Sequence, residues 1–79
     1  MKVPREVSGE DLARLLAQVG YHPTRQTGSH IRLTTQVPGE HHITIPKHYS
    51  LKIGTLNNIL RDVAHHLKIS KDELVRRLW

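Results

Sequence analysis

The sequence of 79 residues contains no cysteine, which excludes disulfide bonds, thiolate zinc sites and cysteine nucleophiles. Aromatic residues are scarce, because phenylalanine is absent and only two tyrosines and one tryptophan occur. Sheets that recognise single-stranded nucleic acid by stacking need several aromatic side chains on one face. If the ligand is a nucleic acid, we therefore expect binding through phosphates and shape.

Long apolar runs are absent as well. The N-terminal segment is charged and interrupted by Pro4, unlike a signal peptide, and no stretch has the ~20 apolar residues of a membrane span. A chain of this length builds one hydrophobic core and no deep substrate cavity. We expect a single cytoplasmic domain over residues 1–79, without membrane association, that meets its ligands on an open face.

Positive charge predominates, since twelve Lys and Arg residues against seven Asp and Glu residues give a net charge of +5. The sequence pI is about 10.1. Such a surface suits a polyanion, because basic side chains that neutralise phosphates release condensed counterions. It equally suits a domain kept soluble by its charge. The net charge alone does not distinguish these two interpretations.

Apolar residues at helical spacing predict a helix over residues 8–19. Ser8 and Asp11 have the spacing of a capping box at its start, and Gly20 is placed to end it in a left-handed conformation. The helix therefore has recognisable signals at both ends.

Two further helices are predicted near the C-terminus. The first begins at residues 54–55, has Thr55 as its N-cap and carries an apolar stripe as far as Leu67. The second is short and begins with a capping box formed by Ser70 and Glu73. Both stripes need an apolar surface to cover.

Between the first and second helices, period-two alternation of β-branched residues predicts three strands. Their expected ranges are 21–26, 29–35 and 41–46, joined by turns at 27–28 and 37–40. Consecutive short strands favour an antiparallel meander. The predicted fold class is α+β, with the order α-β-β-β-α, a short extra C-terminal helix, and helices on one face of the sheet only.

Strand alternation also predicts which side chains face solvent. Ile31 and Leu33 must point toward the helices, so their neighbours on the same strand point the other way. The residues predicted on the open face are His30, Arg32, Thr34, His42 and Thr44. An imidazole and a guanidinium two residues apart are then within reach of one bound phosphate.

The predicted exposure of His30 can be interpreted in two ways. It is one of seven histidines, and an exposed histidine without a role is the simpler interpretation. Alternatively, an imidazole titrates near neutral pH and can take a proton from a ribose 2′-hydroxyl that attacks the neighbouring phosphate. Arg32 would then stabilise the charge that develops on the phosphorane, although it too is explained as a solvated strand residue.

The spacing of the other histidines does not suit a metal site. His65 and His66 are adjacent on a helix and point about 100° apart, and His41 and His42 fall on opposite sheet faces. His48 has no carboxylate or thiolate at a ligand spacing. We therefore predict no metal ion.

Lys47, His48 and Lys52 lead into the helix that starts at residues 54–55. The free amides of a helix start attract an anion, so this segment is a candidate phosphate site. A basic loop without a ligand explains the same residues, and both interpretations stay open.

Four segments of the chain resemble the HicA toxin family, the ribonuclease half of HicA–HicB toxin–antitoxin pairs. They are the opening helix at 8–21, the Gly-Ser-His motif within 25–30, the strand end at 43–46 with His48 after it, and the Gly-Thr-Leu helix start within 52–56, continued at 59–61. The segments have the family's order and spacing over nearly the whole chain.

The resemblance implies a double-stranded-RNA-binding-like fold and metal-independent cleavage of mRNA without a cofactor. It also implies a HicB-type antitoxin as protein partner and a catalytic role for the histidine of the Gly-Ser-His motif, which is His30. The candidate RNA- or phosphate-binding residues are Arg25, Ser29, Arg32, Lys47, His48 and Lys52. The alternatives are a non-catalytic RNA-binding module of the same fold and a domain that binds only proteins.

Overall fold

The computed structural model describes residues 6–79, so the predicted interruption of the N-terminal segment at Pro4 lies outside the described residues. The elements are α1 (Gly9–Leu16), the 3₁₀ turn η1 (Ala17–Val19), β1 (His22–Gln26), β2 (His30–Thr35), β3 (His41–Pro46), α2 (Ile53–Leu67) and α3 (Lys71–Leu78). The fold is α+β with the predicted order. Within residues 6–79, no helix has the length and apolar character needed to cross a membrane.

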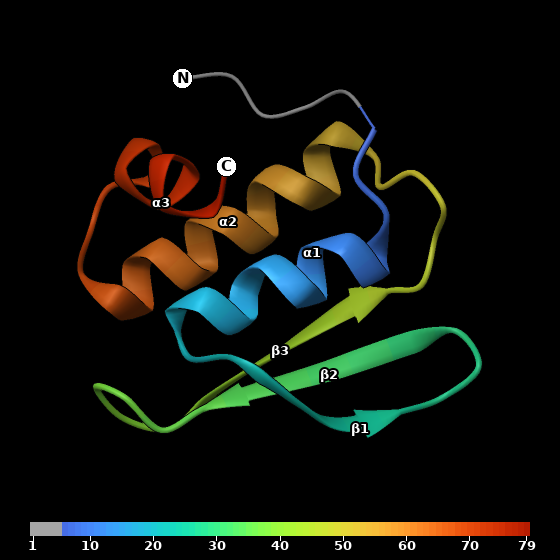
Figure 1. Cartoon of the computed structure of the whole chain (residues 1–79), viewed down its shortest axis with the longest axis horizontal. Helices are drawn as coiled ribbons and strands as arrows, with labels where there is room; N and C mark the ends of the chain where they lie inside the picture. The colour runs from blue at the N-terminus through green and yellow to red at the C-terminus, as the bar shows by residue number, and fades with distance from the viewer. Residues whose placement is uncertain (1–5) are drawn as a thin grey trace.

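The three strands form one antiparallel sheet in the order β1-β2-β3, which is the predicted meander. Its register places Ile31 opposite Ile45 and Leu33 opposite Ile43, so these four apolar side chains share one face. The helices α1, α2 and α3 all lie on one side of the sheet, and no element of residues 6–79 covers its other face, called the open face below (Figure 1). The predicted arrangement of layers is confirmed.

One hydrophobic core fills the space between sheet and helices. Its fully buried members include Leu12 and Leu16 of α1, Leu33 and Ile45 of the sheet, and Leu56, Leu60 and Val63 of α2. The short α3 contributes Leu74, Val75 and Leu78 to the same cluster. Burial of these apolar side chains is what holds the helices on the sheet.

The predicted N-caps of α1 and α3 and the predicted glycine end of the first helix are confirmed, although the carboxylate of Glu73 bonds to Arg76 and Arg77 rather than to the N-cap. The Ser8 hydroxyl accepts a hydrogen bond from the Asp11 amide at 3.0 Å, and Ser70 does the same for Glu73 at 3.0 Å. Gly20 has φ of 95°, the left-handed conformation that glycine adopts without strain. The helix predicted over 8–19 tightens into η1 for its last turn, as helix ends often do.

The start predicted for α2 is wrong. The helix begins at Ile53, its N-cap is the extended residue Lys52, and among residues 6–79 no side chain caps it. The Lys52 carbonyl accepts the first helical hydrogen bond, from the Leu56 amide at 2.9 Å, so Thr55 lies inside the first turn. Thr55 resembled an N-cap in sequence, but the chain enters the helix before reaching it.

Candidate active site

The turn between β1 and β2 presents His30 at the start of β2. The Thr27 amide donates to the His30 carbonyl at 2.9 Å, and the Thr27 hydroxyl accepts from the His30 amide at 3.1 Å. Gly28 does not adopt a left-handed φ, and a Cβ added there would meet nothing within 4 Å. Hydrogen bonds from the Thr27 backbone and side chain therefore close this turn.

The His30 side chain is exposed on the open face of the sheet, as predicted. Its Nδ1 atom lies 2.9 Å from the Ser29 hydroxyl, which fixes the orientation of the ring. Within residues 6–79, the structure gives Nε2 no hydrogen-bond partner. The imidazole is thus held at one nitrogen and available to solvent at the other.

Two arginines stand beside this histidine. Arg25 of β1 is the direct cross-strand partner of Arg32 of β2, and both are exposed. Arg32 follows His30 by two residues, a separation of roughly 7 Å along a strand. Like charges directly opposite each other on a sheet are destabilising, and within residues 6–79 neither arginine forms an ion pair. The pair is therefore suited to an anion that both guanidinium groups contact.

The basic residues after β3 are arranged differently. The Lys47 amide donates to the Ser29 carbonyl at 2.9 Å, which ties this segment to the turn before His30. However, the Lys47 side chain is only 24% exposed, and its ammonium lies 3.8 Å from the Glu10 carboxylate of α1. Lys47 therefore does not join Arg32 on the open face.

His48 and Lys52 are exposed in the connection between β3 and α2, and Lys52 is the N-cap of α2. The structure thus brings Arg25, Ser29, His30 and Arg32 together at one end of the sheet. It places Lys47 and His48 beside the start of α1, next to that group, and Lys52 farther along the connection.

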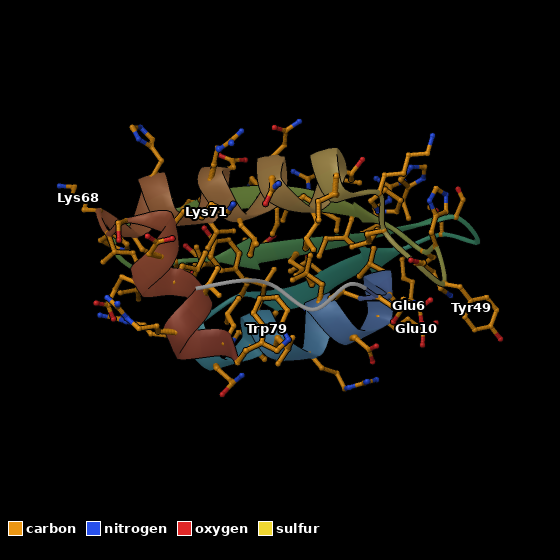
Figure 2. The ribbon with its side chains drawn as sticks, turned by 90° about the horizontal axis from the view of Figure 1, so that it is seen from above. Glu6, Glu10, Tyr49, Lys68, Lys71 and Trp79 are labelled. Atoms are coloured by element: carbon orange, nitrogen blue, oxygen red, sulfur yellow. The ribbon has the colours of Figure 1, made fainter. Side chains whose placement is uncertain are left out.

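Sequence reasoning missed Tyr49, whose side chain is 99% exposed. Figure 2 shows its ring projecting from the end of the molecule where Glu10 also lies. A cavity of about 340 Å³ beside it is lined by Ser8, Glu10, Lys47, His48 and Tyr49. The period-two pattern ends at Pro46, so it carried no information on where the side chains after it point.

A row of polar side chains crosses the open face farther from His30. The Thr34 hydroxyl lies 2.8 Å from that of Thr24 and 2.7 Å from Nδ1 of His42, and the other ring nitrogen of His42 lies 3.0 Å from the Glu40 carboxylate. Thr34 is on the predicted face but only 8% exposed, because these neighbours cover it. His42 is thus engaged by neighbours at both nitrogens, in contrast to His30.

His41 of β3 and His66 of α2 meet where the helix packs on the sheet. His41 Nδ1 is 2.7 Å from the Tyr21 hydroxyl, and its Nε2 is 3.2 Å from the Asp62 carboxylate. His66 stacks on His41 with ring centroids 4.5 Å apart and donates to the Gly39 carbonyl. Burial, and then the negative charge of Asp62, raise the pKa of Tyr21 to about 12. Within residues 6–79, no three His, Asp or Glu side chains are grouped to hold a metal ion.

A family model described as the HicA toxin of bacterial toxin–antitoxin systems matches residues 9–64, which is more than half of the chain. The chain belongs to the HicA toxin family. The matched segment runs from the start of α1 into the last turn of α2 and includes the turn that presents His30. In this HicA toxin, α3 follows the matched segment, and membership of a toxin–antitoxin family implies an antitoxin partner. Comparisons with curated proteins and with solved structures gave no significant match.

Proposed function

We propose that this HicA toxin is a metal-independent endoribonuclease that cleaves mRNA in the cytoplasm. Residues 1–79 act as one domain of double-stranded-RNA-binding type, and a HicB-type antitoxin inhibits it by covering His30. The observation that carries the proposal is the position of the exposed His30 imidazole beside the cross-strand pair Arg25 and Arg32. A proton acceptor next to two cations without acidic partners is what phosphodiester cleavage requires.

In this mechanism His30 acts as general base and then as general acid. When Nδ1 carries the proton and donates it to the Ser29 hydroxyl, Nε2 presents its lone pair to solvent. Nε2 takes the proton of a ribose 2′-hydroxyl, whose oxygen attacks the adjacent phosphorus. The 5′-oxygen then leaves with the proton returned by the imidazolium, and the products carry a 2′,3′-cyclic phosphate and a 5′-hydroxyl.

The phosphate is held mainly by Arg32 and Arg25, which neutralise the charge that builds on its equatorial oxygens. Ser29 is a positioning residue, because it acts on the orientation of the His30 ring. His48 and Lys52 contact neighbouring phosphates, whereas Lys47 is paired with the Glu10 carboxylate. The first turn of α2 contains no acidic residue, whereas that of α1 contains two, so the positive end of α2 remains available to an anion.

The test is RNA cleavage by purified protein in the presence of EDTA. We expect His30→Ala to lower the cleavage rate by about 10²- to 10⁴-fold, the usual contribution of a general acid–base group. His65→Ala is the matched control, because His65 is also exposed but lies on α2, away from the open face. Circular dichroism and thermal unfolding of both variants should match the wild-type protein.

Three outcomes contradict the proposal. If the wild-type protein binds RNA without cleaving it, the protein is the non-catalytic RNA-binding module. Activity that disappears with EDTA, for protein purified free of other nucleases, contradicts a metal-independent reaction. Loss of the folded state in His30→Ala would show that His30 is structural.

A further inference from the structure

Tyr49 is an aromatic residue that the fold itself does not use. Its side chain is 99% exposed, so the ring adds nothing to the hydrophobic core. The backbone on both sides of it is nevertheless fixed. The Gly9 amide donates to the His48 carbonyl at 2.9 Å, and the Leu51 amide donates to the Val7 carbonyl at 2.8 Å. The ring thus stands in solvent on a segment anchored to the start of α1.

The cavity beside Tyr49 suits a neutral, planar group. Its volume of about 340 Å³ lies at the lower end of the range for small-ligand sites. Its lining contains one cation and one anion, Lys47 and Glu10, with 3.8 Å between them. A phosphate in this cavity would meet the Glu10 carboxylate, whereas a nucleobase can donate to it and stack on the tyrosine ring.

This cavity is close to the catalytic histidine. Pro46 is the direct cross-strand partner of His30, and Tyr49 follows Pro46 by three residues, at most ~10 Å of chain. The Lys47 amide is bonded to the Ser29 carbonyl, immediately before His30. A nucleotide next to the scissile phosphate can therefore reach the ring of Tyr49.

We propose that Tyr49 and the cavity lined by Glu10 and Lys47 form a nucleobase-binding subsite that positions RNA at His30. This proposal rests on the nuclease function proposed above. A base must leave its stack to lie on the tyrosine ring, so the toxin selects RNA that is single-stranded at the cleavage position. Tyr49 is a positioning residue that binds the substrate and takes no part in proton transfer.

The experiment measures binding of a fluorescein-labelled, 2′-O-methylated RNA octamer by fluorescence anisotropy. This probe lacks the attacking hydroxyl and stays intact. We expect Tyr49→Ala to weaken binding by about 5- to 150-fold, which corresponds to the ~1–3 kcal/mol of base–aromatic stacking. Tyr49→Phe keeps the ring and should bind within about twofold of the wild-type protein, the tolerance of ordinary surface substitutions.

Two controls separate stacking from other effects. Val37→Ala removes another exposed apolar side chain, which is 71% exposed and lies in the turn after β2, and should leave binding unchanged. The salt dependence of binding should be the same for Tyr49→Ala and wild-type protein, because the ring carries no charge. The same octamer in a duplex should bind more weakly, with no effect of Tyr49→Ala.

The outcomes distinguish this proposal from the nuclease function. If wild-type protein cleaves RNA and Tyr49→Ala binds the octamer equally well, the subsite is wrong and the nuclease function stands. If Tyr49→Phe loses as much affinity as Tyr49→Ala, the hydroxyl rather than the ring face contacts RNA, and stacking is wrong. If wild-type protein neither binds nor cleaves RNA, both proposals fail.

Discussion

At the scale of single residues, two glycines near the candidate active site differ in whether a larger side chain would fit. Gly9 lies where α1 crosses the end of β3, and a Cβ there would stand 2.0 Å from the Pro46 carbonyl oxygen. Gly28 lies in the turn before His30, where an added Cβ meets nothing within 4 Å. Only Gly9 is therefore needed for packing, because backbone atoms cannot move aside as a flexible side chain does.

We predict that Gly9→Ala destabilises the protein by about 1–3 kcal/mol, since the overlap forces a shift of backbone. Gly28→Ala should change the free energy of unfolding by no more than about 0.5 kcal/mol. Urea unfolding followed by circular dichroism measures both. Equal stability of the two variants would contradict the close approach of α1 to β3.

Residues inside the strands were predictable one by one, whereas those after β3 were not. The exposure of His30 and Arg32 follows from strand alternation, a local rule that needs only the apolar neighbours Ile31 and Leu33. The cross-strand position of Arg25 required the register, which includes an irregularity between Pro23 and Arg25. The pairing of Lys47 with Glu10 joins residues far apart in sequence, so no local period reveals it.

At the scale of elements, Tyr21 connects three parts of the fold. It precedes β1, its hydroxyl bonds to His41 of β3, and His41 pairs with Asp62 of α2. Alternation predicted that His41 faces the helices, but not that it meets Asp62 there. Such contacts depend on how α2 lies across the sheet, which helical periodicity does not determine.

The burial of Tyr21, together with the negative charge of Asp62, predicts a loss of stability at high pH. The pKa of Tyr21 is raised to about 12 in the folded protein, from 10.0 for an ordinary tyrosine. Between these values the unfolded chain releases the phenol proton and the folded protein retains it, so rising pH favours unfolding. The stabilisation is complete below about pH 10 and declines by ~1.4 kcal/mol per pH unit until about pH 12.

Urea unfolding between neutral pH and about pH 12 tests this prediction by comparing wild-type protein with Tyr21→Phe. The variant lacks the titrating group, so its stability should fall less steeply over this range. Tyr49→Phe is the matched control, because it removes the only other tyrosine hydroxyl, which is exposed. Identical pH profiles for wild-type protein and Tyr21→Phe would contradict the role of Tyr21.

At the scale of the whole molecule, the arginines differ in whether an acidic side chain pairs with them. On the helices, Arg14 pairs with Asp11, and Arg76 and Arg77 pair with Glu73, whose pKa these arginines lower. On the open face, Arg25 and Arg32 have no such partner within residues 6–79. Composition predicted the net charge, but only the fold shows which arginines have an acidic partner.

This asymmetry predicts which arginines control the salt dependence of RNA binding. The logarithm of the binding constant should fall linearly with the logarithm of salt concentration, and each phosphate contact to single-stranded RNA contributes about 0.7 to the slope. Arg25→Ala and Arg32→Ala should each make the slope shallower by about that amount. Arg14→Ala removes the same charge from α1, away from the open face, and should leave the slope unchanged. Equal slopes for all three variants would mean that RNA binding depends only on the net charge. That result would contradict the open face as the binding surface.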